Sequence, residues 1–149
     1  MNWHTWVDHV AIMKKSWKLL PKILSGEKTI ESRWYMNKSA PWDNIQPGET
    51  VYFKNSSEPV TIQAMVSKVL QFQDLTPLKV KQILEEYGGK DGIGVTDLEK
   101  TYQLFKHKKY CLLIFLKNPE PIKPFDINKK GFGIMAAWLC IDDINKIKS

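Results

Sequence analysis

The sequence has few of the residues that build metal sites or disulfide frameworks, with two cysteines and three histidines in 149 positions. No pair of these residues has the short spacing of zinc ligands, so we expect no metal and no cofactor. Cys111 and Cys140 each lie in an apolar run, where a thiol acts as a small buried hydrophobic group. No apolar run has the length of a membrane span, and the first residues lack the layout of a secretion signal. These absences predict a cytoplasmic protein without a membrane segment.

Basic residues are in modest excess, because 22 of them against 16 acidic residues give a net charge of +6. The excess is concentrated, because Lys14 to Lys38 contains seven basic residues and two acidic ones. A local basic patch favours approach to a polyanion such as nucleic acid. With 43% hydrophobic residues the chain has enough apolar surface for one core, and residues 1–149 are predicted to form a single domain.

Arginine is almost absent, since Arg33 stands alone among 21 lysines. Lysine therefore supplies the general positive charge of this protein. A position that needs a planar group with five hydrogen-bond donors would explain the single exception.

Periodicity and turn residues predict alternating strands and helices. A strand at 9–14 precedes a helix over 17–25. Ser16 is the expected N-cap of this helix, and Gly26 the residue that ends it in a left-handed conformation. Because Pro21 lies within the segment, the helix must be short or begin late. Helices are expected over 77–87, capped by Thr76, and over 95–107, beginning near Thr96. The other strands are expected at 29–36, 50–54, 60–72, 110–116, 122–125 and 135–141, with a proline-rich corner at 118–124. Most strands follow one another through turns, which predicts an α+β fold with a mixed or antiparallel closed sheet.

The segment Gly26 to Arg33 concentrates the polar chemistry. In an extended chain the side chains of Thr29, Glu31 and Arg33 point to one face, and those of Lys28, Ile30 and Ser32 to the other. If that polar face is buried, Glu31 and Arg33 must pair with each other, because an unpaired buried charge is very costly. Such a pair beside a cavity can hold the edge of a base or a phosphate. The alternative is a solvent-exposed ion pair on an edge strand.

This segment, together with the Pro-Gly-acidic turn and aromatic strand of 47–54 and the long strand that follows, resembles the ASCH domain, a PUA-like family. The resemblance is clear over residues 10–72. It implies a small β-barrel with peripheral helices and a cleft lined by the lysine, glutamate and arginine of the motif. In these terms residues 9–72 form the motif-bearing core, 76–107 a helical insertion and 110–141 the closing strands.

The resemblance implies an RNA- or nucleotide-binding module whose partner is RNA or a nucleoside-like small molecule. Some family members are instead hydrolases, acting on acetylated cytidine or as ribonucleases. In that alternative Lys28 matches the catalytic lysine, acting as base or nucleophile, with Thr29 beside it, and Glu31 stands where the hydrolase branch has a second hydroxyl residue. Glu85 or Glu86 is the candidate acidic partner.

Aromatic residues near the basic segment suit stacking on bases. Trp34 and Trp42 fit stacking and core packing equally, whereas Trp17 and Trp138 are expected in the core. Lys54 and Asn55 lie at the end of a predicted strand, where they offer a ligand a positive charge and a side-chain amide. The candidate ligand-binding set is Lys28, Glu31, Arg33, Trp34, Trp42, Lys54 and Asn55.

Overall fold

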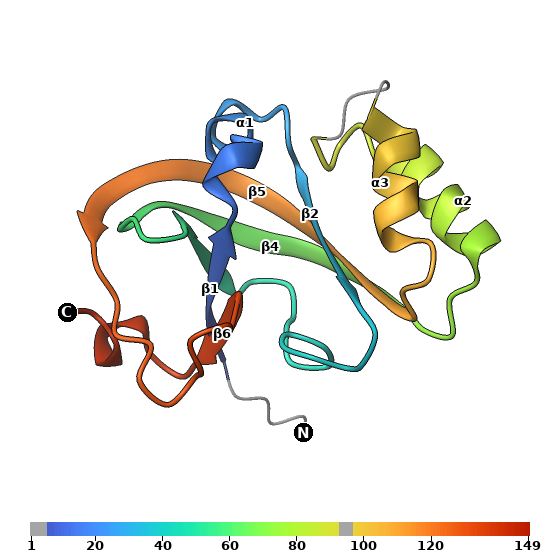
Figure 1. Ribbon diagram of the computed structural model, residues 1–149. Coiled ribbons are helices and arrows are strands. Elements are labelled where there is room, and N and C mark those ends of the chain that lie inside the picture. Colours follow the sequence, from blue (N-terminus) through green and yellow to red (C-terminus); the bar gives the residue numbers. More distant parts are fainter. Residues whose placement is uncertain (1–5, 93–96) are drawn as a thin grey trace.

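A computed structural model describes residues 6–92 and 97–149, which form one six-stranded sheet with helices around it (Figure 1). The strands lie in the order β2-β5-β4-β3-β1-β6, and all neighbours are antiparallel except β1 and β3, which are parallel. Their bounds are β1 Asp8–Met13, β2 Ile30–Tyr35, β3 Thr50–Asn55, β4 Val60–Phe72, β5 Tyr110–Phe125 and β6 Trp138–Ile141. This mixed sheet with helices is the α+β class that the sequence predicts.

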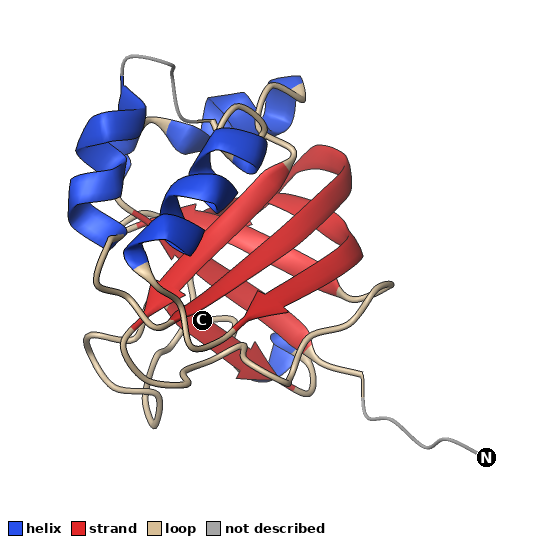
Figure 2. Ribbon diagram, turned by 90° about the vertical axis from the view of Figure 1, so that its right-hand side faces the viewer, coloured by secondary structure: helices blue, strands red, loops and turns tan. Residues whose placement is uncertain are grey.

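The sheet curls strongly, as the crossing strands of Figure 2 show. Within the described residues no ladder joins its two edge strands, β2 and β6, so the curl is a half-barrel with an open seam. The α+β barrel-like fold expected from the sequence is therefore confirmed, but the predicted closure of the sheet is not observed among the described residues, because β2 and β6 do not pair.

Helices cover this half-barrel. They are α1 Leu19–Ser25, α2 Pro77–Tyr87 and α3 Leu98–Phe105, with short 3-10 helices η1 Lys15–Trp17 and η3 Ile144–Lys146. In Figure 1, α1 lies above the curled sheet, and α2 and α3 lie side by side near β2. No helix within 6–92 and 97–149 combines the length and the apolar character needed to cross a membrane.

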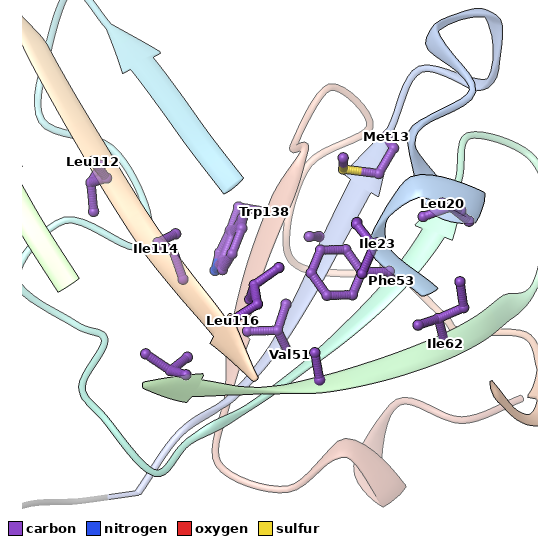
Figure 3. Packing of buried hydrophobic residues seen from close by; sticks show 13 residues of the cluster. Met13, Leu20, Ile23, Val51, Phe53, Ile62, Leu112, Ile114, Leu116 and Trp138 are labelled. Atoms are coloured by element: carbon purple, nitrogen blue, oxygen red, sulfur yellow. The ribbon is translucent and has the colours of Figure 1, made fainter. Parts of the chain in front are cut away.

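Alternation along β5 divides the core into an inner and an outer part. Leu112, Ile114 and Leu116 face the inside of the curl, where residues of α1 and of the other strands pack (Figure 3). The intervening Cys111 and Leu113 face α2 and α3 instead. Because the first part of β5, Tyr110 to Leu116, is apolar on both faces, it forms an almost continuous hydrophobic run in the sequence.

The first helix begins later than Ser16 predicts. Ser16 lies inside η1, the chain reverses at Lys18 with φ 54°, and α1 starts at Leu19. Pro21 then falls in the first turn, where its missing N–H has no partner to lose. The predicted left-handed end is confirmed at Gly26, with φ 84°. A short helix and a sharp stop bring the next residues directly to the start of β2.

β5 is one strand of 16 residues, so the predicted corner at 118–124 is wrong. The ladder between β2 and β5 ends at the pair Ile30 and Phe115, and beyond it the β2 side of β5 is an edge in the described structure. Prolines are tolerated on such an edge because no ladder hydrogen bond needs their N–H. The chain therefore remains paired with β4 as far as Phe125.

The two later helices agree with their sequence signals. Thr76 caps α2, since its hydroxyl accepts a hydrogen bond of 3.2 Å from the amide of Lys79, and Pro77 is the first helical residue. The helix predicted over 95–107 corresponds to α3. Its expected start near Thr96 lies outside the described residues.

Candidate functional site

A cavity of about 540 Å³ lies over the start of β2. One wall comes from the segment of η1 and α1, including Trp17 and Lys22, and the opposite wall comes from α3, including Lys100 and Phe105. Buried Lys28, Glu31 and Asp91 line the cavity together with partly buried Ser32 and Arg33, and we call these five residues the floor cluster.

Lys28 is the most buried member of the floor cluster. Its ammonium Nζ lies 2.6 Å from Oδ1 of Asp91, 3.1 Å from Oε1 of Glu31, and 2.7 Å from the carbonyl oxygens of both Ile30 and Asp91. Only 1% of the side chain is exposed. A tightly held ammonium at this place ties the start of β2 to the turn that contains Asp91.

Charge compensation governs the pKa values of this cluster. Burial lowers the pKa of Lys28, but the attraction of Glu31 and Asp91 outweighs it and raises that pKa above its ordinary value. Burial likewise opposes ionisation of Glu31, yet Lys28 and Arg33 hold its pKa below normal. For Asp91 burial prevails over the attraction of Lys28, and its pKa is raised. The pKa of Lys28 is thus shifted away from the neutral amine that a base or nucleophile requires.

Asp91 also holds the Ser32 side of β2. Its Oδ2 accepts a hydrogen bond of 2.5 Å from the hydroxyl of Ser32, and its Oδ1 accepts one of 3.1 Å from the Ser32 amide. The Ser32 hydroxyl in turn accepts a hydrogen bond of 3.1 Å from Nε1 of Trp34. A single carboxylate therefore organises both the lysine and the serine of the motif.

Arg33 bridges the open seam of the half-barrel. It starts on β2, where Nε and Nη2 donate to Oε2 of Glu31 at 3.1 and 2.9 Å, as the i,i+2 spacing predicts. Its other contacts cross the seam. Nη1 lies 3.2 Å from the carbonyl oxygen of Ala137, and Nη2 lies 3.5 Å from the carbonyl oxygen of Ile12. The guanidinium carbon lies over the ring of Trp138, 5.0 Å from its centroid. The planar five-donor group expected at the single arginine thus has a use in joining β2 to β1 and β6.

A second buried polar network fixes Trp138 beneath Arg33. Nε1 of Trp138 donates to Nδ1 of His9 at 3.0 Å, so the proton of the neutral imidazole is on Nε2, which donates to Glu49 at 2.8 Å. Glu49 also accepts hydrogen bonds from the amides of Val7 and Gln46. Burial lowers the pKa of His9, although Glu49 opposes that shift. His9 is accordingly neutral in the folded protein.

This burial predicts a pH dependence of stability. Below about pH 6.5 the imidazole of the unfolded chain binds a proton that buried His9 does not, so the free energy of unfolding falls as the pH decreases toward the lower folded pKa. We expect the wild-type protein to lose stability between about pH 6.5 and 5 relative to His9→Gln, by at most about 1.4 kcal/mol per pH unit. Urea unfolding of both proteins across this range measures the difference. A difference that is constant with pH would contradict a neutral His9.

Known proteins resemble this chain in structure rather than in sequence. No family model matches the chain, and no curated protein matches its sequence significantly. Among solved structures, an ASCH protein from Zymomonas mobilis superposes with a TM-score of 0.62 at 16% identity, covering 89% of this chain and 85% of the other. A tyrosine-to-phenylalanine variant of that protein gives a TM-score of 0.64 at 16% identity, with coverage of 95% and 99%. The chain has the fold of an ASCH domain.

The N-terminal domain of McrB from Staphylothermus marinus shares the fold more distantly. Its TM-score is 0.51 at 12% identity, covering 85% of this chain and 81% of the other. At these identities the likeness concerns the fold alone, and it confirms the ASCH-type fold expected from the motif.

The ASCH fold brings only part of the predicted site together. Lys28, Glu31, Arg33 and Trp34 line the cavity. The remaining predicted residues, Thr29, Trp42, Lys54 and Asn55, do not belong to its lining. The motif on β2 therefore reaches the cavity, whereas the strand end at Lys54 and the loop at Trp42 do not.

Each of the four outlying residues has a structural setting of its own. Thr29 uses its backbone to bond Lys90 and β5. Trp42 packs edge-on against Tyr110 at 5.2 Å. Lys54 and Asn55 end β3, where burial lowers the pKa of Lys54 and the Asn55 amide donates to Glu58 at 3.0 Å.

Of the tryptophans expected in the core, Trp138 is buried as predicted and Trp17 is not. Trp34 is 7% exposed and stacks on Phe105 at 5.0 Å, so it packs α3 against β2. Trp17, expected in the core, is 50% exposed on the cavity wall, and the ammonium of Lys14 lies 5.1 Å from its ring centroid. The cause is the late start of α1, which leaves Trp17 in η1.

The acidic partner of Lys28 also differs from the predicted one. Glu85 and Glu86 lie on exposed positions of α2, while Asp91, in the turn after that helix, contacts Lys28. Sequence reasoning missed Asp91 because it lies 63 residues away in an ordinary turn. Ser32, expected on the same face of the extended chain as Lys28, contacts the same carboxylate.

Proposed function

We propose that the cavity binds single-stranded RNA or a nucleotide, with one base stacked on Trp17 and phosphate groups attracted by the surrounding lysines. The observation that carries this proposal is an exposed indole on the wall of a basic cavity, with Lys14 above it and Lys22 and Lys100 lining the same space. Aromatic faces stack on bases, and lysines on the rim neutralise phosphates, in most proteins that bind single strands.

Size and charge support the same ligand class. A volume of about 540 Å³ lies within the usual range of small-molecule sites and accommodates a nucleotide. The floor cluster is electrically balanced, because Lys28 and Arg33 face Glu31 and Asp91. The net charge of +6 therefore acts through exposed lysines, which favours a polyanion approaching from outside.

Hydrolysis with Lys28 as the base or nucleophile is the less favoured function. That chemistry needs a neutral amine, whereas both carboxylates of the floor cluster raise the pKa of Lys28. Binding requires no such change in protonation and agrees with the geometry as it stands.

Replacing Trp17 tests the proposal. We expect Trp17→Ala to weaken binding of a fluorescently labelled single-stranded RNA by about five-fold or more, because base stacking contributes about 1 to 3 kcal/mol. Fluorescence anisotropy at about 50 mM and about 200 mM salt measures the affinity, which must fall as salt rises if phosphates are contacted. Trp17 is half-exposed, so the substitution leaves the core intact.

Trp6→Ala is the matched control. Trp6 is 55% exposed, comparable with Trp17, but it does not line the cavity. We expect this variant to bind RNA as the wild type does. Equal loss in both variants, or a wild-type affinity insensitive to salt, would contradict the proposed function.

A further inference from the structure

The floor cluster has almost no hydrogen-bond donors left for a ligand. The three protons of the Lys28 ammonium face four acceptors, namely two backbone carbonyls and the carboxylates of Glu31 and Asp91. The hydroxyl proton of Ser32 is given to Asp91. The indole proton of Trp34, beside the cluster, is given to Ser32. Each of these groups is therefore saturated as a donor.

Arg33 retains little donor capacity as well. Nε donates to Glu31, and Nη2 donates to Glu31 and lies near the carbonyl of Ile12 and the sulfur of Met13. Nη1 donates one proton to the carbonyl of Ala137. Among the contacts made by described residues, one of the five guanidinium protons stays unused.

Acceptor capacity, in contrast, remains. A carboxylate offers about four lone-pair positions. Glu31 receives one hydrogen bond or ion pair at Oε1 and two at Oε2, and Asp91 receives two at Oδ1 and one at Oδ2. Each carboxylate thus keeps one position that no described residue fills, and both side chains line the cavity with 5% and 8% of their surface exposed.

We propose that the cavity selects bases that carry an exocyclic amino group, adenine, cytosine or guanine, over those with a carbonyl oxygen in its place. The inference rests on the proposed function and specifies its ligand. An amino group brings two donors to a floor that supplies acceptors on Glu31 and Asp91. The carbonyl oxygen of uracil or hypoxanthine at the same place would instead face carboxylate oxygens, so this contact has no hydrogen bond and brings like partial charges together. The neighbouring ring N–H of these bases is then the one donor they bring to the floor cluster, against the two of an amino group.

Matched nucleotide pairs test this selection on the wild-type protein. Cytidine and uridine monophosphate differ by an amino group against an oxygen and by the proton that the adjacent ring nitrogen carries in uridine, and adenosine and inosine monophosphate differ in the same way. By isothermal titration at one salt concentration, we expect the amino member of each pair to bind at least about ten-fold more tightly. Equal affinities within both pairs, or tighter binding of the oxygen members, would overturn the proposed selection.

A ligand-side control avoids substitutions that endanger the fold. Cytidine monophosphate dimethylated on its exocyclic nitrogen keeps the ring and the phosphate but has no amino protons. We expect its affinity to fall to that of uridine monophosphate or below, whereas binding equal to that of the unmodified nucleotide would contradict amino recognition. The two proposals fail differently: absence of binding for all these nucleotides and for RNA refutes the proposed function, while uniform binding refutes only the selectivity.

Discussion

Lys28→Met is expected to lower the free energy of unfolding by about 3 to 5 kcal/mol, the cost of removing one partner from a buried ion cluster. The substitution keeps the apolar stem but leaves Asp91 without an ion-pair partner among the described residues and Glu31 with Arg33 alone. Urea unfolding near neutral pH, followed by tryptophan fluorescence, measures the loss. The loss should shrink in acid, where the two carboxylates become protonated and no longer need the ammonium.

Two further variants separate charge compensation from side-chain size. Lys90→Met removes an exposed lysine at the same corner and should leave the unfolding midpoint near that of the wild type. The double variant Lys28→Met, Asp91→Asn leaves Glu31 paired with Arg33, so it should recover part of the lost stability. If Lys28→Met were as stable as Lys90→Met, the view of Lys28 as a structural ammonium would be wrong.

Arg33→Lys is expected to cost about 2 to 3 kcal/mol although it conserves the charge. An ammonium can pair with Glu31, but it lacks the planar fork that also meets the carbonyls of Ile12 and Ala137 across the seam. Urea unfolding gives the overall loss. Hydrogen exchange of the Ile12 amide measures the loss of stability at the seam itself, because this amide donates a hydrogen bond of 2.9 Å to the same Ala137 carbonyl.

Two control variants test whether the guanidinium of Arg33 holds the seam. Lys146→Ala removes the exposed ion pair of Lys146 with Asp142 and should change neither the midpoint nor the exchange of Ile12. Arg33→Ala should cost more than Arg33→Lys, since it also leaves Glu31 without its second cation. Faster exchange at Ile12 in the lysine variant is the decisive result. Unchanged exchange there would mean that Arg33 does not hold the seam.

Local patterns in the sequence determined much of the scaffold. Alternation and turn residues predict β4 over 60–72 as observed, Gly26 ends α1 as expected, and Thr76 with Pro77 begins α2. The pairing of Glu31 with Arg33 is also local, because residues two apart on a strand share a face. Predictions from local patterns were wrong where the effect of a residue depends on which strands lie beside it. The prolines of 118–124 do not end β5, since the strand has an open edge there.

The sequence by itself determined an α+β fold with an ASCH-like motif, and it marked Lys28, Glu31 and Arg33 as a polar group. Only the tertiary structure decided what these groups do. The bond of Lys28 to Asp91 spans 63 residues, and that of Arg33 to Ala137 spans 104, so both depend on how the sheet curls and where its seam remains open. Periodicity describes which face a side chain occupies, but it does not specify which distant segment meets that face.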